Sequence, residues 1–364
     1  MKRMPAVADD FSVDWLNQAL QPRLQGERVL QCHARESDIP GQTAEILLLD
    51  VTYTASRKDL PTRLVAKVTS RNSLVLEQVI ANYDQYRRET AFYQEFADCG
   101  MAVPDCLYAD HNPETQEMVL LLEDLSPATC PSWAATPDQV EMALASLPGF
   151  HGKWWNAPVL REKDFLVQFD NELFFSAVFH AADAAQPALE SLYDSPDLTI
   201  EAMTVLNQKR DAVLRFFASR PFTLVHGDFH TKQMFFPSAD GGAFAVIDWQ
   251  FPFVNAGAWD FARMLSMCMA TDQRHDREEQ LITNYLKGLQ QAGVEDYLRD
   301  EFILDYKVGL LMSQMIMTIS AADTDPKLFE IECGALGVDW RDVIFDRTQR
   351  AMAEQDVLGF LKSL

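Results

Sequence analysis

The sequence of 364 residues is poor in the features that mark several large classes of protein. Positive charge is scarce, since 31 Lys and Arg stand against 54 Asp and Glu, for a net charge of −23. Nucleic acids and anionic membranes attract proteins through a positive field, so neither is expected as a partner. No apolar run reaches the roughly 20 residues of a membrane-spanning helix. The longest, residues 308–322, is interrupted by polar residues and predicts a buried helix.

Cysteine is sparse as well. The six cysteines are scattered without a Cys-x-x-Cys pair, which predicts reduced thiols rather than a zinc site or a disulfide framework. The first ten residues, MKRMPAVADD, have no apolar stretch after their basic residues, so no secretory signal is predicted and a cytoplasmic protein is expected. Motifs of zinc metalloproteases, α/β-hydrolases, dinucleotide-binding proteins and P-loop proteins are absent from the sequence.

Apolar residues are plentiful at 48%, which is enough for a full core. In the first third of the chain, three short runs rich in Leu, Ile and Val predict strands, and a long pattern with helical spacing lies between the second and third runs. The runs are residues 45–53, 63–69 and 118–122, and the helical pattern spans residues 73–96.

The character of the chain changes after residue 124. Helical patterns dominate from there on, apart from a compact β-like segment at residues 222–247 with a Gly-Gly turn. We therefore predict an α+β fold of two lobes, a small β-rich lobe over residues 1–122 and a larger, mainly helical lobe over residues 123–364.

Two aspartates end apolar runs in the β-like segment. Asp228 lies in LVHGDFHTKQMFF, and Asp248 lies in FAVIDWQ. Carboxylates that converge on one point are costly unless a positive charge lies between them. Mg²⁺ bound to a nucleotide polyphosphate is the usual solution. The pattern therefore indicates a site for a divalent metal and a nucleotide.

HGDxxxxQ followed by IDWQ resembles the aminoglycoside phosphotransferase and choline kinase superfamily, whose pattern is HGDxxxxN followed by [IV]D[FW]. The Trp-Gln pair after Asp248 is most similar to its ecdysteroid kinase-like branch. Further similarities follow in the family's order: Lys67 in RLVAKV, Glu89 in RRETAFY, LLEDL at residues 121–125, LPGFHGKWW at residues 147–155, and residues 257–262.

The resemblance implies a protein-kinase-like fold and transfer of the γ-phosphoryl group of ATP to a hydroxyl of a small molecule, with Mg²⁺. Asp228 would orient the acceptor hydroxyl or accept its proton, and Asp248 would ligate Mg²⁺. Lys67 would pair with the phosphates and be held by Glu89. The resemblance also implies Gln233 as a metal ligand and the backbone of Leu122, Glu123 and Asp124 as the adenine contact.

The sequence departs from the family pattern at two places. Position 233 is Gln where the family usually has Asn, which moves the amide one methylene outward. The candidate phosphate loop, residues 40–44, has one glycine. Both departures favour an alternative, a degenerate kinase-like module that binds nucleotide with weak or no transfer. A protein kinase is less favoured, because no activation-segment-like stretch follows Asp248.

Several residues have two interpretations. Glu77 rivals Glu89 as the partner of Lys67, although Glu89 is preferred because it precedes Phe-Tyr. His226 is expected to hold the loop, whereas His230 faces either substrate or solvent. For Asp260, loop fixing or helix capping is favoured over metal ligation.

The other candidates are expected to be structural. His151, beside two tryptophans, and the phenylalanines between residues 165 and 179 are expected to pack. The acidic residues near those phenylalanines, Asp164, Asp170 and Glu172, are interpreted as a solvated face rather than as a site for a cationic acceptor.

Overall fold

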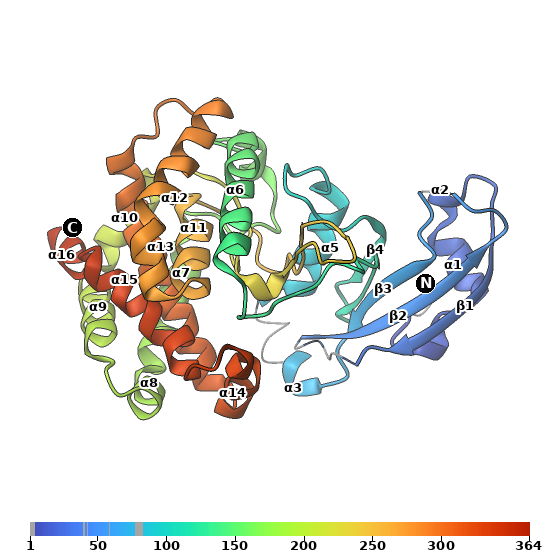
Figure 1. The fold of residues 1–364 in the computed structure, drawn as a ribbon, viewed down its shortest axis with the longest axis horizontal. Coiled ribbons are helices and arrows are strands. Elements are labelled where there is room, and N and C mark those ends of the chain that lie inside the picture. Colours follow the sequence, from blue (N-terminus) through green and yellow to red (C-terminus); the bar gives the residue numbers. More distant parts are fainter. Residues whose placement is uncertain (1–3, 39–40, 42, 58, 77–82) are drawn as a thin grey trace. The chain divides into compact units, whose positions relative to one another are not determined.

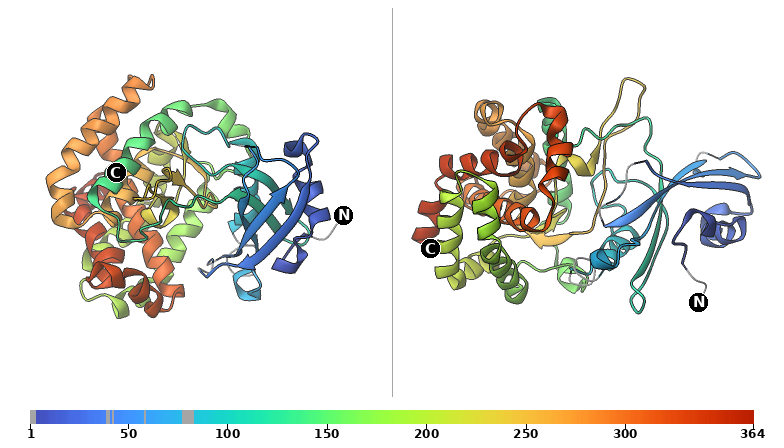
Figure 2. Two further views of the ribbon diagram at one scale, coloured as in Figure 1. Left: turned by 45° about the vertical axis from the view of Figure 1, so that its right-hand side comes forward. Right: turned by 90° about the horizontal axis from the view of Figure 1, so that it is seen from below.

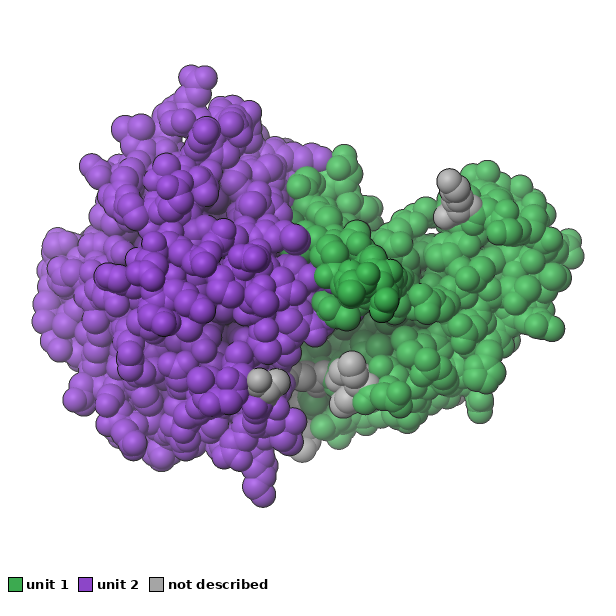
Figure 3. Space-filling model, viewed as in Figure 1, with its two compact units in different colours: residues 1–129, 237–251 green, residues 130–236, 252–364 purple. Residues whose placement is uncertain are grey.

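The computed structural model describes residues 4–38, 41, 43–57, 59–76 and 83–364 (Figure 1). The chain forms two compact units, coloured separately in Figure 3. The N-terminal unit contains Met1–Thr129 and Pro237–Phe251, and the C-terminal unit contains Cys130–Phe236 and Pro252–Leu364. The sequence predicts a single boundary after residue 122, whereas in the structure residues 123–129 and a later segment, Pro237–Phe251, also belong to the N-terminal unit.

The N-terminal unit contains a five-stranded antiparallel sheet in the order β1-β2-β3-β5-β4. The three central strands correspond to the three predicted runs. The edge strands were missed, because their sequences VLQCHARE and CLYADHN mix polar and apolar residues, as suits strands with one unpaired side. The strands are β1 (Val29–Glu36), β2 (Ala44–Tyr53), β3 (Arg63–Thr69), β4 (Cys106–Asn112) and β5 (Glu117–Glu123).

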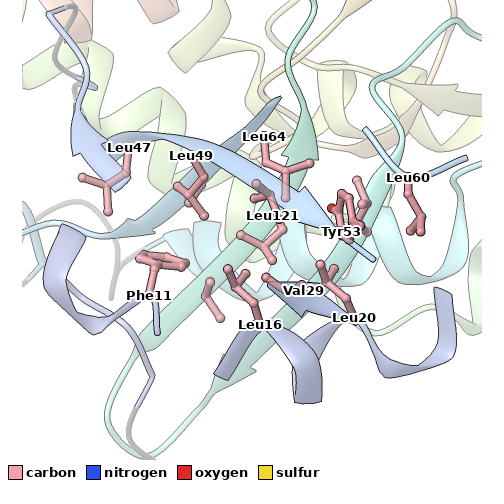
Figure 4. Packing of buried hydrophobic residues seen from close by; sticks show 14 of the residues in the cluster. Phe11, Leu16, Leu20, Val29, Leu47, Leu49, Tyr53, Leu60, Leu64 and Leu121 are labelled. Atoms are coloured by element: carbon pink, nitrogen blue, oxygen red, sulfur yellow. The ribbon is translucent and has the colours of Figure 1, made fainter. Parts of the chain in front are cut away.

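One face of this sheet carries the core of the unit. Alternate residues of β3, such as Leu64, point into it together with Leu16 and Leu20 of the N-terminal helical segment (Figure 4). Each of these leucines is at most 1% exposed, and burying one contributes about 1.5–3 kcal/mol. The period-two alternation of β3 places Lys67 on the opposite face. The helices on the core side are η1 (Ala8–Asp10), α1 (Val13–Ala19) and α2 (Gln21–Leu24), and Figure 2 shows them beside the sheet.

The predicted helix over residues 73–96 is found as two described pieces, α3 (Ser73–Val75) and α5 (Gln85–Glu95). Residues 77–82 between them lie outside the described residues. Asp84 has a φ of 52°, in the left-handed region, so a continuous right-handed helix does not pass through it. Helix α5 contacts β4 and β5 and carries Glu89.

The segment Pro237–Phe251 is attached to the N-terminal unit by several contacts. It contains β8 (Ala245–Val246), where the amide of Val246 donates to the carbonyl of Ala102 at 2.8 Å. The ring of Trp249 stacks on Phe92 of α5, with centroids 3.9 Å apart. These contacts explain why a stretch so late in the sequence belongs to the first unit.

The C-terminal unit is mainly helical (Figures 1 and 2). Its short strands β6 and β9 pair antiparallel, and its helix α11 is buried along its whole length and packs against α6 and α13. The elements are α6 (Pro137–Lys153), η3 (Pro158–Glu162), α7 (Glu172–Ala184), α8 (Gln186–Leu192), α9 (Asp197–Gln208), α10 (Arg210–Ser219), β6 (Thr223–Val225), η4 (Thr231–Gln233), β7 (Met234–Phe235), β9 (Phe253–Asn255), α11 (Ala258–Cys268), α12 (Thr271–Gln291), α13 (Arg299–Asp323), α14 (Pro326–Cys333), η5 (Gly334–Leu336), η6 (Asp342–Asp346), α15 (Arg347–Glu354) and α16 (Val357–Ser363).

Helix α13 is the one helix in the described part of the chain that is long and apolar enough to cross a membrane. In this structure 72% of its most apolar window is buried inside the protein. The predicted buried helix over residues 308–322 is thereby confirmed, and α13 serves as a core helix of the C-terminal unit.

Trp249→Ala tests how firmly the late segment is attached. The change removes a ring that has no exposed surface and stacks on Phe92, so it should lower the free energy of unfolding by about 3–5 kcal/mol. Urea denaturation measures the loss, with the half-buried Trp15→Ala as the matched control of smaller cost. A loss below about 1 kcal/mol for Trp249→Ala would contradict the attachment.

Candidate active site

The N-terminal unit brings three predicted residues together around Lys67. The Lys67 Nζ on β3 lies 2.9 Å from Oε1 of Glu89 on α5 and 2.6 Å from Oδ1 of Asp248. Lys67 is 8% exposed and Glu89 is 1% exposed. The predicted contact between Lys67 and Glu89 is present, whereas the rival Glu77 lies outside the described residues.

The charges of this cluster are unbalanced. Burial opposes the Lys67 ammonium, but the carboxylates of Asp248 and Glu89 outweigh it and raise the pKa of Lys67 above its usual range. Burial likewise raises the pKa of Glu89 to about 7, although Lys67 works against that rise. One ammonium thus contacts two carboxyl groups, and the pKa shifts show that Lys67 keeps its proton while the negative charge of Glu89 is opposed by burial.

Asp248 is held in an unusual backbone conformation. Its φ of 65° lies in the left-handed region, which a non-glycine residue keeps only where its surroundings fix it. The residues that follow supply those surroundings. Trp249 stacks on Phe92, and the Gln250 amide donates to Thr43 Oγ1 at 2.9 Å. Gln250 therefore links the Asp248 segment to the start of β2.

The candidate phosphate loop, residues 40–44, is described at residues 41, 43 and 44. A Cβ on Gly41 would lie 2.2 Å from the carbonyl oxygen of Ala44, so the backbone approach there requires glycine. Tyr86 of α5 donates to the Thr43 carbonyl at 2.6 Å. The single glycine of this loop therefore has a clear steric role.

The predicted adenine contact lies at the end of β5. The amide of Glu123 donates to the Asp105 carbonyl at 2.9 Å, and the amide of Asp124 donates to the Arg63 carbonyl at 3.3 Å. The Asp124 carboxylate also pairs with Arg63 at 3.2 Å. These two amides are therefore used within the unit, and an adenine would meet other backbone groups of this stretch.

The C-terminal unit presents Asp228 in the loop after β6. Arg263 Nε donates to its Oδ1 at 2.9 Å, and the second Arg263 contact is to the same oxygen. The Gln233 amide nitrogen donates to Oδ2 at 3.2 Å, and His230 Nε2 lies 3.3 Å from Oδ2. The longer side chain of Gln233 therefore reaches Asp228.

The charge of Asp228 is stabilised by its neighbours. Burial alone would raise its pKa, but His230, Arg263 and His226 outweigh burial and hold the pKa of Asp228 well below the usual range. Burial lowers the pKa of His230, so the permanent positive charge in contact with Asp228 is that of Arg263.

Two neighbours of Asp228, His230 and Arg263, were not assigned a role from the sequence. His230 is 5% exposed and its ring lies 4.7 Å from that of Trp133, so it does not face solvent. Arg263 is not among the site residues predicted from the sequence. The signal was present, because position 263 follows Asp260 by three residues and so shares its face of α11.

The loop itself is fixed by Asp260. The amides of His226 and Gly227 donate to the two Asp260 oxygens at 2.7 and 3.0 Å, and the Asp228 amide donates to His226 Nδ1 at 3.2 Å. Gly227 has a φ of 83°, which this tight turn requires. The loop-holding roles predicted for His226 and Asp260 are confirmed, whereas the N-cap of α11 is Gly257.

His151 does more than the packing expected of it. Its Nε2 lies 3.4 Å from Oδ2 of Asp260, and its Nδ1 lies 2.8 Å from the Tyr285 hydroxyl. His151 and Asp260 are fully buried. His151 therefore positions the carboxylate that fixes the loop containing Asp228.

The phenylalanines between residues 165 and 179 pack, as expected. Phe175 and Phe179 are each 1% exposed, and Phe175 makes an edge contact with Phe217 at 4.9 Å. Nearby, Asp170 pairs with Arg161 at 2.7 Å in an exposed bridge of the kind that contributes little to stability. Asp170 therefore has a cationic partner within the chain.

Among residues 4–38, 41, 43–57, 59–76 and 83–364, no group of three or more His, Cys, Asp or Glu side chains is arranged to hold a metal. The two aspartates follow strands of different sheets, because β6 pairs with β9 and β8 pairs with β7.

The fold defines the class of the protein. An ethanolamine kinase of Plasmodium vivax is 10% identical with a TM-score of 0.51, covering 91% of this chain and 83% of that one. A GDP complex of aminoglycoside 2′-phosphotransferase-IIIa is 12% identical with a TM-score of 0.51, covering 96% and 99%. The likeness shows a protein-kinase-like fold with a small β-rich N-terminal part and a larger helical C-terminal part, as predicted.

The family follows from the sequence match. Residues 43–295, more than half of the chain, match the ecdysteroid kinase-like family, and the chain belongs to that family. The sequence matches none of the curated proteins with which it was compared. The resemblance stated from the motifs is therefore confirmed at the level of the family.

Gly257→Ala tests the support beneath the loop. A Cβ there would lie 2.5 Å from the Tyr285 hydroxyl and 2.6 Å from His151 Nδ1, so the hydrogen-bonded pair would have to shift. We expect a loss of about 1–3 kcal/mol in the free energy of unfolding, measured by thermal denaturation. Gly149→Ala in α6 is the matched control, because its Cβ meets nothing within 4 Å. Equal stability of the two variants would refute the steric argument.

Proposed function

We propose that this protein is an ATP-dependent phosphotransferase that moves the γ-phosphoryl group to a hydroxyl of a small molecule. The observation that carries the proposal is the contact of Lys67 with both Glu89 and Asp248 inside a buried cluster. A lysine held between two carboxylates stays protonated and is positioned to bind a polyphosphate. Membership of the ecdysteroid kinase-like family supports the same reaction class.

The chemistry assigned to each residue follows from its surroundings. The acceptor oxygen forms a bond to the γ-phosphorus while the bond from that phosphorus to the bridging oxygen of ADP breaks, and the hydroxyl proton is released. Asp228, ionised beside Arg263, orients the hydroxyl and accepts its proton. Lys67 binds the α- and β-phosphates in place of one of its carboxylate contacts.

Mg²⁺ is the metal that suits the two proposed ligands, Asp248 and Gln233. Oδ1 of Asp248 contacts Lys67, and the amide nitrogen of Gln233 contacts Asp228, so Oδ2 and the amide oxygen are the atoms that would meet a cation. Mg²⁺ usually has only one or two ligands from the protein, because it keeps several water ligands and binds the phosphates of the substrate. When bound, the ion would neutralise charge on the phosphates.

The acceptor class is a small molecule with a hydroxyl group. The two similar structures are named for ethanolamine and aminoglycoside substrates, which are compounds of this kind. The net charge of −23 is compatible with a neutral or cationic acceptor, and nucleic acid and membrane partners are not proposed. We place the reaction in the cytoplasm, where ATP is available.

The paired variants Asp228→Asn and Asp248→Asn separate the two proposed roles. ADP release is measured with ATP, Mg²⁺ and a library of small hydroxyl compounds. Asp228→Asn should lower turnover by about a hundredfold or more while nucleotide binding is unchanged, because Asp228 acts on the acceptor. Asp248→Asn should weaken Mg²⁺-dependent nucleotide binding, measured by calorimetry with and without EDTA.

The matched control is Asp240→Asn, an exposed aspartate in the same late segment, which should leave both quantities unchanged. Wild-type protein that neither binds ATP with Mg²⁺ nor releases ADP with any acceptor would overturn the proposed function. Unchanged turnover of Asp228→Asn would overturn the role of that residue alone.

A second candidate is a degenerate nucleotide-binding module with weak or no transfer. The observation that favours it is Gln233, which replaces the usual Asn and directs its amide nitrogen to Asp228. Against it stands the intact cluster of Lys67, Glu89 and Asp248.

Gln233→Asn decides between the two candidates. The shorter side chain should move the amide group, now 3.2 Å from Asp228, away from its present position, and a displacement of about 1 Å lowers a positioned reaction by about a hundredfold. We therefore expect turnover to fall in single-turnover assays, while Gln233→Glu tests the need for the amide nitrogen. A large gain in turnover on Gln233→Asn would favour the degenerate module instead.

A further inference from the structure

Arg263 is a buried cation with no role so far in the proposed reaction. It lies on α11, is 3% exposed, and directs both Nε and a terminal nitrogen to Oδ1 of Asp228. Its guanidinium also contacts α13, with Ser313 Oγ at 3.5 Å and Met317 Sδ at 3.7 Å. The side chain is therefore fixed from two sides.

The contacts of Asp228 fill its capacity to accept hydrogen bonds. A carboxylate offers about four lone-pair positions, two on each oxygen. Oδ1 receives the two Arg263 donors, and Oδ2 is contacted by Gln233 at 3.2 Å and by His230 at 3.3 Å. An acceptor hydroxyl can therefore reach Asp228 only by replacing one of these groups.

The two oxygens differ in how firmly their partners are held. The Arg263 donors are charged, buried and anchored on α13, and charge-assisted bonds are about twice as strong as neutral ones. The partners of Oδ2 are the amide of Gln233 at 3.2 Å and the imidazole of His230 at 3.3 Å, both farther away than Arg263 Nε, which lies 2.9 Å from Oδ1. His230 also has a buried Nδ1 without a hydrogen-bond partner. An acceptor hydroxyl would therefore replace a partner of Oδ2 rather than a partner of Oδ1.

We infer that Arg263 is the positioning residue of the phosphoryl transfer: it fixes Oδ1 of Asp228 and leaves Oδ2 to meet the acceptor hydroxyl. This inference rests on the proposed function. Arg263 acts through Asp228 rather than on the substrate, because its side chain is 4% exposed whereas that of Asp228 is 21% exposed. Two residues of α11 thus fix this loop. Asp260 binds the backbone amides of His226 and Gly227, and Arg263 binds the side chain of Asp228.

The geometry requires arginine in particular. Lysine carries one nitrogen on a flexible stem, so it cannot direct two nitrogens at Oδ1 while also contacting Ser313. Removing Arg263 would leave the partly buried carboxylate without its permanently charged donor. The orientation of Asp228 would then be set by the exchangeable partners on Oδ2.

The test compares Arg263→Met, Arg263→Lys and wild type in steady-state ADP release, with nucleotide binding measured separately. We expect kcat of Arg263→Met to fall by about a hundredfold. KM for ATP and the affinity for ATP should stay within about threefold of wild type, because Arg263 contacts Asp228, which acts on the acceptor hydroxyl rather than on the nucleotide. Arg263→Lys should recover part of kcat, and guanidinium ion at low concentration should partly rescue Arg263→Ala.

The matched control is Arg274→Met. Arg274 is fully buried in the same unit and pairs with Glu278 at 2.9 Å and Glu354 at 2.6 Å, but it contacts no proposed site residue in the described part of the chain. Its loss should lower the melting temperature and leave kcat per folded protein unchanged. If Arg263→Met is insoluble, Arg263→Lys and the guanidinium rescue carry the test.

The outcomes distinguish a failure of the proposed function from a failure of the role inferred for Arg263. Wild-type protein without ADP release overturns the proposed function and this inference together. Active wild type with kcat of Arg263→Met within threefold, or a loss that Arg274→Met reproduces per folded protein, overturns the role of Arg263 alone. A loss of kcat confined to Arg263 variants and partly restored by lysine or guanidinium supports it.

Discussion

The contact of Lys67 with two carboxylates is the constraint on which the N-terminal unit is built. A buried ammonium is costly unless carboxylates surround it, and here they come from α5 and from Asp248, which lies 181 residues after Lys67. The stacking of Trp249 on Phe92 and the link from Gln250 to Thr43 hold that late segment in place. The strained backbone of Asp248 is the local cost of bringing its carboxylate to the lysine.

In the C-terminal unit, a single helix fixes the loop that contains Asp228. Helix α11 supplies Asp260, which binds the loop amides, and Arg263, which binds the Asp228 carboxylate. Because all of α11 is buried, these charged groups are protected from water and are paired rather than solvated. His151 and Tyr285 extend the network to α6 and α12, so three helices together define the position of a single loop.

The sequence predicted what is local or carried by strong motifs. The three central strands, the buried helix α13 and the pairing of Lys67 with Glu89 follow from alternation, apolar content and the family pattern. It missed β1 and β4, whose edge positions tolerate polar residues, and it missed Arg263, whose meaning depends on the helix face it shares with Asp260. It also placed the boundary between the lobes at one position, because no local pattern reveals that a late hairpin returns to the first unit.

Because the segment Pro237–Phe251 belongs to the first unit, the protein cannot be divided into its two units by one cut. The polypeptide passes from one unit to the other three times, near residues 129, 236 and 251, so no single cut yields two whole pieces. A fragment ending at residue 129 would keep Lys67 and Glu89 but lose the counter-charge that Asp248 provides, and it would uncover the face of Phe92. The charge cluster around Lys67 is therefore complete only after most of the chain has been synthesised, which ties the maturation of the first unit to the synthesis of the second.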